Sequence, residues 1–532
     1  MTTEKLSTSS DTKITRFLPP SVVSLAFFLV YLIVFAHSPA LFNDPDAAWH
    51  IIAGDMVRST GHLPDTNTWS FVVPDQKWYL VSWLWDVTMS GIHSLGGTLA
   101  VFVVTQALVA LTLALVIYHI RSRGGISNAV LIIIAVLAAI SFNRFVACRP
   151  QLIGYLFLAF YHFRLHQSRT NLSWRPLLWF PVLMLIWVNM HGSFFTGFLL
   201  IGVYALEALW HRNWPWLMRL ASITGVCLIV VLFNPYGFGI YHAVMGTLGS
   251  IMPQFIEEWG PFTFGRDWGV TRWLVLFLFL SNFREPTIPL ADKLLSALWL
   301  VPMLSSVRHA SIFILLSAPY IAINLQRFIE YVKGRHSLRF VNKFEIRIPL
   351  LQPVMALAAL AAILASMGFT GKFRQDSYVL SPWFDSRPAI AWMMQHLQGK
   401  RVLNDYDFGG IVIYESHGTF PVFVDGRAGT AYPEEVLSDY ERFEHFYRDW
   451  EKVPNKYRID AILTNNQHTF AARYVEGARY QDWELAYSDP VASIFVRKPP
   501  PVAAPEATPE KEKPVKKKTA APAESEDDSK DN

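Results

Sequence analysis

The sequence predicts a polytopic α-helical membrane protein with about eleven transmembrane helices and a C-terminal extracytoplasmic α/β domain. First, 52% of the 532 residues are hydrophobic and only 17% are charged, which is too apolar for a soluble chain. Second, the hydrophobic residues lie in runs that approach the roughly 20 residues needed to cross a bilayer core. Third, 19 Trp and 20 Tyr suit the aromatic belts of a membrane protein.

The long apolar runs lie at residues 18–35, 99–120, 126–142, 194–209, 217–233, 310–325 and 348–367. Shorter runs form two adjacent pairs, at 151–163 with 176–188 and at 273–283 with 294–304. Because the short runs come in pairs, losing a whole pair as spans would not change the side of the membrane on which the later loops lie. The first run is long for a cleavable signal peptide, and no small-residue cleavage pattern follows it, so we predict that it is retained as a helix.

Lys and Arg gather in alternate loops, as expected of cytoplasmic segments. They include Arg121 and Arg123, three arginines within 164–175, and six Lys or Arg residues within 327–347. With eleven spans, all of these fall on the same side as the N-terminal segment 1–17, which is therefore predicted to be cytoplasmic. The opposite side then carries a long first outer loop, 36–98, and the chain after residue 370.

The long spans are almost free of charge, with Glu207 and Arg219 near inner ends as the exceptions. A proton- or ion-coupled transporter more often buries ionisable groups near mid-membrane. The polar residues instead indicate a reaction or binding site at the outer membrane–water boundary. The net charge of +4 arises in the loops rather than in a basic, aromatic-rich stripe, so nucleic-acid binding is not predicted. Cys148 and Cys227 lie at or in predicted spans and indicate neither a metal cluster nor a disulfide framework.

The first outer loop begins with a predicted helix that lies in the membrane interface. Asp44 is placed as its N-cap and Pro45 as its first residue. An apolar stripe at helical spacing follows, formed by Trp49, Ile52, Ala53 and Met56. Gly61 and Pro64 should end this helix. A second interfacial segment, rich in aromatic residues at 78–85, leads towards the second span.

The region 370–498 is predicted to be a periplasmic α/β domain. Helices are expected at 388–397 and 434–446, and short strands at 401–404, 421–424 and 461–464. A hairpin at 483–496 would turn at Asp489-Pro490. The alternation of strands and helices favours a small, largely parallel sheet. The tail 499–532 is rich in Pro, Ala, Lys and Glu and is predicted to be disordered.

Polar and aromatic motifs recur along the predicted outer surface. They are Asp44-Pro45-Asp46, Trp49-His50-Ile51, Trp83-Leu84, Arg149-Pro150-Gln151-Leu152, Asn189-Met190-His191-Gly192, Asn234-Pro235-Tyr236-Gly237, Glu258-Trp259, Arg308-His309, Asn404-Asp405-Tyr406-Asp407-Phe408-Gly409-Gly410 and Asp425-Gly426-Arg427. In this order they resemble a widespread bacterial family of polytopic membrane proteins and, more broadly, the GT-C superfamily of membrane glycosyltransferases. Related chains often carry a polar pair such as His-Glu just before Trp83. Here Val81 and Ser82 stand instead, which leaves open whether a second acid acts there.

The resemblance covers residues 43–497. It implies a GT-C-like transmembrane domain over 18–369, a sugar donor linked to polyprenyl phosphate, and a multi-pass location in the bacterial inner membrane. Asp44 would then be the base that takes the acceptor proton, although it can equally be an N-cap, and both roles are compatible. Asp46 is favoured by the helix dipole alone. Alternatively, it positions the acceptor or binds Mg or Mn, with Glu257 or Glu258 as a further oxygen ligand.

The departing phosphate would need cationic or polar partners. Arg149 and Arg308 are candidates because a guanidinium can hold phosphate by two hydrogen bonds, although either can instead extend to lipid headgroups. His191 and His309 are further candidates for the phosphate, or are structural. The acceptor could contact Trp49 and His50, or Asp425 and Arg427 in the C-terminal domain. An Asp-Gly-Arg turn held by its own ion pair is the other interpretation of the last two.

The resemblance implies an inverting glycosyltransferase that moves a sugar from a polyprenyl-phosphate donor to an acceptor hydroxyl at the outer face of the membrane. Its partners would be the lipid-linked donor and membrane lipids. One alternative is a non-catalytic protein that binds or transports lipid-linked glycans. Another is a scaffold for envelope assembly, in which the α/β domain does the work.

Overall fold

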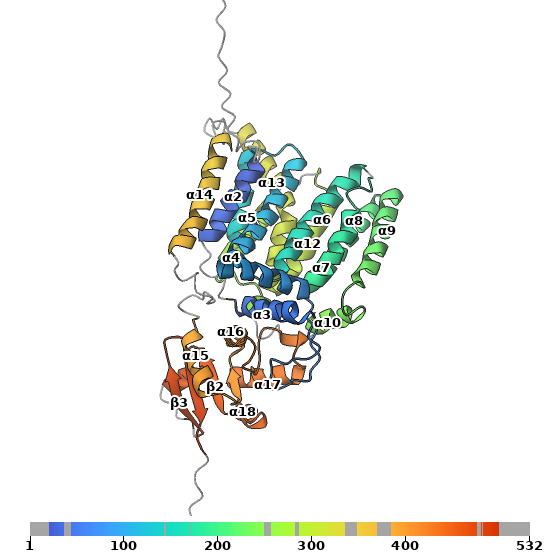
Figure 1. Ribbon diagram of the computed structural model, residues 1–532. Coiled ribbons are helices and arrows are strands. Elements are labelled where there is room, and N and C mark those ends of the chain that lie inside the picture. The colour runs from blue at the N-terminus through green and yellow to red at the C-terminus, as the bar shows by residue number, and fades with distance from the viewer. Residues whose placement is uncertain are drawn as a thin grey trace, which may run out of the picture. The chain divides into compact units, whose positions relative to one another are not determined.

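The computed structural model describes residues 21–36, 44–142, 145–171, 173–248, 257–281, 287–335, 348–369, 385–475, 480 and 482–499. Every apolar run predicted as a span overlaps a helix of this structure (Figure 1). These helices are α2 (Val22–Ala36), α4 (Trp83–Ser122), α5 (Asn128–Phe142), α6 (Gln151–Asn171), α7 (Trp179–Met190), α8 (Phe195–Trp210), α9 (Trp214–Val231), α11 (Trp268–Leu280), α12 (Leu290–Ser305), α13 (Ala310–Arg335) and α14 (Ile348–Phe369). The cytoplasmic segment predicted at 1–17 lies outside the described residues.

Among the described residues, four helical stretches are long and apolar enough to cross a membrane: Trp83–Ser122, Gly192–Trp210, Trp214–Val231 and Val307–Gly334. Several other apolar helices are shorter than a full span, for example α7 and α11. The number of membrane crossings, about eleven by the sequence, therefore stays a prediction. Large apolar side chains are exposed on the outer helices, such as Met218 and Ile229 on α9, as expected for surfaces that face lipid.

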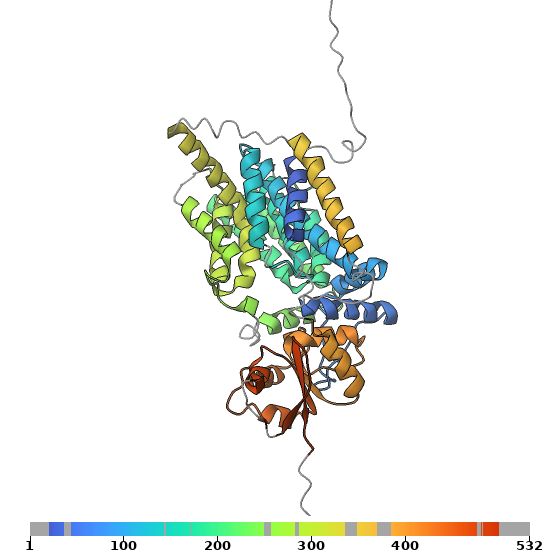
Figure 2. The ribbon, with the colours of Figure 1, turned by 90° about the vertical axis from the view of Figure 1, so that its left-hand side faces the viewer.

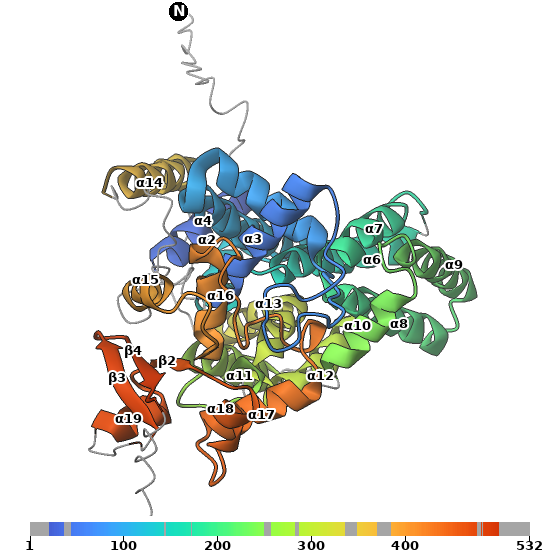
Figure 3. The same ribbon diagram turned by 60° about the horizontal axis from the view of Figure 1, so that its bottom comes forward.

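Helix α4 breaks sharply at Gly96 and Gly97. Gly97 has φ 61° and ψ −158°, a conformation that is essentially limited to glycine. The break separates the predicted span 99–120 from a preceding helical part that begins at Trp83. That first part packs against the helix of the first outer loop (Figure 3).

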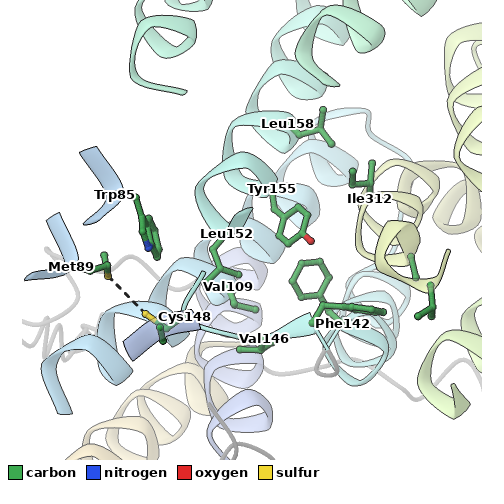
Figure 4. Close-up of a cluster of buried hydrophobic side chains, with 14 of the residues drawn as sticks. Trp85, Met89, Val109, Phe142, Val146, Cys148, Leu152, Tyr155, Leu158 and Ile312 are labelled. Atoms are coloured by element: carbon green, nitrogen blue, oxygen red, sulfur yellow. Dashed lines mark hydrogen bonds between the residues drawn. The ribbon is translucent and has the colours of Figure 1, made fainter. Parts of the chain in front are cut away.

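The core of the helical bundle lies where α4, α5, α6 and α13 meet (Figure 4). Its buried side chains include Trp85, Val109, Phe142, Leu152, Leu158 and Ile312. Cys148 is buried in the same cluster, with its Sγ 4.0 Å from Sδ of Met89. Cys148 and Cys227 are both free thiols.

Helix α3 (Pro45–Thr60) confirms the helix predicted in the first outer loop. Asp44 is its N-cap and accepts a hydrogen bond from the backbone N–H of Asp46 at 3.1 Å. Gly61, with φ 72°, forms the C-cap. The helix is more enclosed than an interfacial helix, because α4 packs on it from the bundle and α16 (Tyr406–Glu415) from the C-terminal segment. Gly54 permits the first contact, since a β-carbon there would lie 2.1 Å from the carbonyl oxygen of Asp86.

The C-terminal segment alternates helices with a four-stranded sheet. Its elements are α15 (Arg387–His396), β1 (Val402–Asn404), α16, α17 (Glu434–Glu444), α18 (Lys452–Lys456), β2 (Ala461–Asn465), α19 (Thr469–Val475), β3 (Trp483–Ser488) and β4 (Ala492–Arg497). In Figure 2 the orange helix α16 lies against the blue helix α3, and the strands extend away from the bundle. The described residues up to Arg497 form one compact unit. The predicted tail lies outside the described residues apart from Pro499.

Two predictions for this segment were wrong. The sheet, of order β1-β2-β4-β3, is mixed rather than largely parallel, because only β1 and β2 pair in parallel. Residues 421–424 form no strand of this sheet. Asn404 binds the N–H of Phe423 and the carbonyl of Val424 through its side chain, and Val422 bridges to Ser70 of the first loop. The backbone groups expected to join the sheet are thus satisfied elsewhere.

Candidate active site at the start of helix α3

Arg149 and the two acids of the first loop form one ion-paired cluster. Nε of Arg149 lies 2.5 Å from Oδ2 of Asp44, and Nη2 lies 2.8 Å from Oδ1, which is a bidentate arrangement. Nη2 also lies 3.4 Å from Oδ2 of Asp46. Arg149 stands in the connection between α5 and α6, so the fold brings together residues separated by 105 positions. The guanidinium predicted to bind a phosphate is therefore engaged with carboxylates.

A third carboxylate completes this cluster. Nη1 of Arg149 donates to Oε1 of Glu258 at 2.7 Å, from the short helix η4 (Glu257–Trp259). The side chain of Glu257 lies outside the described residues. Three carboxylates thus face one guanidinium, which leaves an excess of negative charge when all are ionised.

Asp46 has the chemical properties of a base. Burial and the neighbouring charge of Asp44 raise the pKa of Asp46 to about 6, although Arg149 and His50 act against this rise. Its Oδ1 accepts a hydrogen bond from Nε1 of Trp49 at 3.2 Å. A carboxyl with this pKa is ionised at neutral pH and remains basic enough to take a proton. The carboxylate of Asp44 is less available to take a proton, since both of its oxygens accept hydrogen bonds from Arg149.

His50 has an acidic partner that the sequence analysis missed. Its Nδ1 lies 2.6 Å from Oδ1 of Asp86, and Oγ of Ser82 donates to Oδ2 of the same carboxylate at 3.2 Å. All three residues are buried. The His50 ring also lies against Trp49 in a tilted arrangement, with ring centroids 3.6 Å apart and an interplanar angle of 31°. Asp86 lies one helical turn after Ser82, and this i,i+4 spacing could have been recognised from the sequence.

The C-terminal segment covers the cluster through two glycines. A β-carbon on Gly426 would lie 1.6 Å from Oδ1 of Asp46, and one on Gly410 would lie 2.2 Å from the carbonyl oxygen of Pro45. The backbone of this segment therefore approaches the start of α3 as closely as atoms allow. It leaves the side chain of Asp46 only 14% exposed.

Asp425 and Arg427 bind each other rather than face the cluster. Arg427 donates to both oxygens of Asp425, at 2.8 and 2.6 Å, and both side chains are fully buried. The guanidinium lies 4.9 and 4.6 Å from the ring centroids of Trp69 and Trp78 in the first loop. This geometry fits the ion-paired turn, and burial leaves neither side chain open to an acceptor.

Asp407 was part of a motif in the sequence analysis but was given no role of its own. On α16, Gly410 packs on Pro45, and the hydroxyl of Tyr414 lies 3.1 Å from Nε2 of His93, so this face of the helix meets the bundle. Asp407 precedes these residues by three and seven positions and shares their face. It lies within electrostatic range of Asp46, Asp44 and Arg149. Its side chain is exposed and has no hydrogen bond or ion pair within the described residues.

A second polar group, which we call the Arg308 group, contains Arg308, Trp259, His309 and His191. The Arg308 guanidinium lies 4.2 Å from the centroid of the Trp259 ring. Nε1 of Trp259 and Nδ1 of His309 are buried without a hydrogen-bond partner in the described structure. His191 accepts from the N–H of Ser193 at 3.1 Å. Burial, Arg308 and His50 lower the pKa of His191 to about 3, so its imidazole is neutral at pH 7.

The predicted Mg or Mn site, with Asp46 and Glu257 or Glu258 as ligands, stays a prediction. Among the described residues, no three His, Cys, Asp or Glu side chains are arranged to hold an ion. Asp46 and Glu258 both contact Arg149.

No protein-family model and no curated protein matches the sequence. Among solved structures, the chain resembles the oligosaccharyltransferase AglB from Archaeoglobus fulgidus in complex with an inhibitory peptide and a dolichol-phosphate. The TM-score is 0.55, with 12% identity, over 83% of this chain and 69% of that one. For the apo form of that enzyme the TM-score is 0.54 and the identity 12%, over 85% of this chain and 70% of that one. For ArnT from Cupriavidus metallidurans in the apo state the TM-score is 0.50 and the identity 13%, over 88% of this chain and 96% of that one. The chain thus shares the fold of AglB and ArnT. The sequence resemblance predicted a fold of the GT-C superfamily.

Proposed function

We propose that this protein is a membrane glycosyltransferase that moves a sugar from a polyprenyl-phosphate donor to an acceptor hydroxyl. The observation that carries the proposal is the cluster of Asp44, Asp46 and Glu258 around Arg149, at the first outer loop of a GT-C fold. The solved AglB complex contains a dolichol-phosphate, which supports a lipid phosphate as the leaving group here. Lys and Arg in the opposite loops support a site on the extracytoplasmic face of a bacterial inner membrane.

The reaction is a single displacement with inversion. The acceptor oxygen attacks the anomeric carbon on the face opposite the phosphate. A new C–O bond forms while the bond between the anomeric carbon and the phosphate oxygen breaks. The hydroxyl proton passes to the carboxylate of Asp46, and the electron pair of the broken bond leaves with the polyprenyl phosphate. Asp44 caps α3 and, through Arg149, fixes the direction of its neighbour.

The Arg308 group is proposed to bind the departing phosphate. Its guanidinium is not engaged with a carboxylate in the described structure, in contrast to that of Arg149. The unpartnered Nε1–H of Trp259 offers a further donor, because buried polar atoms normally have a partner. Neutral His191 can donate through its other ring nitrogen. Together these groups would stabilise charge as it develops on the phosphate oxygens.

Asp407 is proposed to position the acceptor. It is exposed, it shares a helix face with Gly410, and its carboxylate can accept hydrogen bonds from sugar hydroxyls. The C-terminal segment, residues 370–498, would then form an extracytoplasmic α/β domain that covers the donor site and holds the acceptor. In this arrangement Trp49 orients the Asp46 carboxylate through its hydrogen bond, and the ring of His50 lies against Trp49.

The experiment compares lipid-linked sugars and surface glycans by mass spectrometry in cells that carry the intact protein, a deletion, Asp46→Asn or Asp44→Asn. Asp55→Asn is the matched control, because Asp55 lies on the same helix with a half-exposed side chain that pairs with Arg58. Loss of one sugar unit, with accumulation of its lipid-linked donor, is expected in the deletion and in Asp46→Asn but not in Asp55→Asn. Unchanged glycans in the deletion would overturn the transferase and favour a binding or scaffold role.

A further inference from the structure

A separate cluster of charged residues lies at the end of the helical bundle away from α3. Helices α8 and α12 each contain 16 residues, so their two ends are roughly 24 Å apart. His191 and Arg308 stand near one end of these helices, and Glu207 and Lys293 near the other. In Figure 1, this second end lies at the top of the bundle, opposite the C-terminal segment.

The cluster lines a pocket with a volume of about 500 Å³ between the ends of α6, α8, α9 and α12. Its charged and polar walls come from Arg169, Glu207, His211, Asn213 and Lys293, and its apolar walls include Trp216, Ile288 and Leu290. Trp210, on the rim, is 76% exposed. An exposed Trp beside cationic side chains is typical of a membrane–water boundary.

The polar contacts leave cationic groups available in this pocket. Glu207 already has partners within the protein: its Oε1 accepts from the backbone N–H of Ala291 and from Nη1 of Arg169, both at 3.0 Å. The same nitrogen of Arg169 contacts Oε2 at 3.3 Å, whereas Nε and Nη2 of Arg169 have no hydrogen-bond partner within the described residues. Lys293 is exposed and has no acidic partner there either. The pocket therefore has a net positive charge with donors unused.

The surface next to the pocket is apolar. On α8, Leu206 and Leu209 are 58% and 49% exposed, and on α9 Met218 is 65% exposed. These side chains lie within about two turns of the pocket along their helices, where acyl chains would run beside the bundle. A phosphate in the pocket and hydrocarbon against these leucines would belong to one molecule.

We infer that this pocket binds the headgroup of an anionic phospholipid from the leaflet opposite the candidate active site. Arg169 and Lys293 would hold the phosphate, and Trp210 would lie at the level of the glycerol backbone. The site is independent of the proposed glycosyl transfer, because it shares no residue with it. Bound lipid would tie α6, α8, α9 and α12 together at the end where Glu207 already joins two of them.

The test uses native mass spectrometry of the full-length protein, incubated in detergent with equimolar phosphatidylglycerol and phosphatidylcholine. Wild type should retain phosphatidylglycerol at least fivefold over phosphatidylcholine, since one cation near a headgroup is worth about a factor of five. Lys293→Glu should remove this preference. Lys400→Glu, which changes an exposed lysine of the C-terminal segment by the same charge, should keep it.

Lys293→Gln provides a milder variant, with an expected loss of about fivefold, if the charge reversal prevents folding. Equal preference for phosphatidylglycerol in the wild type and in a folded Lys293 variant would overturn the inference. Glycerol phosphate is the second probe. If it displaces the bound lipid as effectively as a short-chain phosphatidylglycerol does, the ligand is a soluble phosphate and the lipid assignment is wrong.

Discussion

Gly426 and Asp46 are in direct contact, although 380 positions of sequence separate the C-terminal segment from the start of α3. A β-carbon on Gly426 would lie 1.6 Å from Oδ1 of Asp46. The contact means that a backbone atom, rather than a side chain, closes one side of the candidate site. The two parts of the chain cannot approach in this way if residue 426 carries any side chain.

Gly426→Ala is therefore expected to move the C-terminal segment away from Asp46 and to lower turnover at least tenfold. The protein should still insert into the membrane, because the bundle core does not include this glycine. Transfer from the accumulated lipid-linked donor, measured with purified protein, checks this. Gly265→Ala is the control, since a β-carbon there meets nothing within 4 Å. Full activity of Gly426→Ala would disprove the close contact.

Removal of the Arg149 guanidinium should destabilise the protein strongly. Arg149→Ala would leave Asp44, Asp46 and Glu258 facing one another without a cation, and breaking a largely buried ion pair costs about 3 kcal/mol or more. Thermal unfolding in detergent should show a clear fall in Tm. Arg58→Ala should change the free energy of unfolding by less than about 1 kcal/mol, because its ion pair with Asp55 is half-exposed. Similar shifts in the two variants would contradict this view of the cluster.

The pH dependence of transfer should reflect Asp46. The pKa of Asp46 is raised to about 6, so the proposed base is protonated below that pH and ionised above it. We therefore expect kcat/KM to rise as pH increases through about 6 and then to level off. His191 does not interfere, because its pKa of about 3 keeps it neutral over this range. A flat profile between pH 5 and 7 would argue against Asp46 as the proton acceptor.

Asp86 should matter for stability through His50. In Asp86→Ala, Nδ1 of His50 and Oγ of Ser82 lose a buried partner, with an expected cost of about 2–3 kcal/mol. Asp86→Asn retains an acceptor for one of them and should cost less. Unfolding midpoints of the two variants provide the comparison. Equal effects would mean that packing around residue 86, rather than these hydrogen bonds, determines the outcome.

Arg308 is expected to act on the donor rather than on the base. Arg308→Ala should raise KM for the lipid-linked donor and weaken inhibition by free polyprenyl phosphate about tenfold or more, because charge-assisted contacts to phosphate are lost. Arg308→Lys should restore part of this loss through its charge. Arg327→Ala serves as the control, since that side chain is exposed near the C-terminal end of α13. Unchanged donor inhibition in Arg308→Ala would remove Arg308 from the phosphate site.

The helices were predictable because each apolar run must be shielded from water along its whole length, either by other helices or by lipid. Asp44 and Pro45 marked the start of α3 correctly, since capping is a local property of the backbone. The strand predicted at 421–424 failed for the opposite reason. The side chain of Asn404 and the backbone near Ser70 satisfy this stretch, and neither is local in sequence.

The same distinction applies to the candidate site. The residue types of the proposed phosphate site could be predicted from motifs at the ends of spans. The partner of each side chain could not be predicted, because Arg149 meets Asp44 only after α5 and α6 have packed beside α3. Asp86 was not identified, and Asp407 was given no role of its own, because an acid in a first helical turn usually needs no explanation beyond the helix dipole.

The contact between the first outer loop and the C-terminal segment can form only late in synthesis. Nδ2 of Asn67 donates to the carbonyl oxygen of Ala431, and the ribosome adds this second residue 364 positions after the first. At about 5–20 residues per second, the first outer loop waits roughly 20–70 seconds for its cover. During that interval Asp46 lacks the backbone of Gly426 that later covers it. A factor that accompanies the nascent chain would be most useful in this interval.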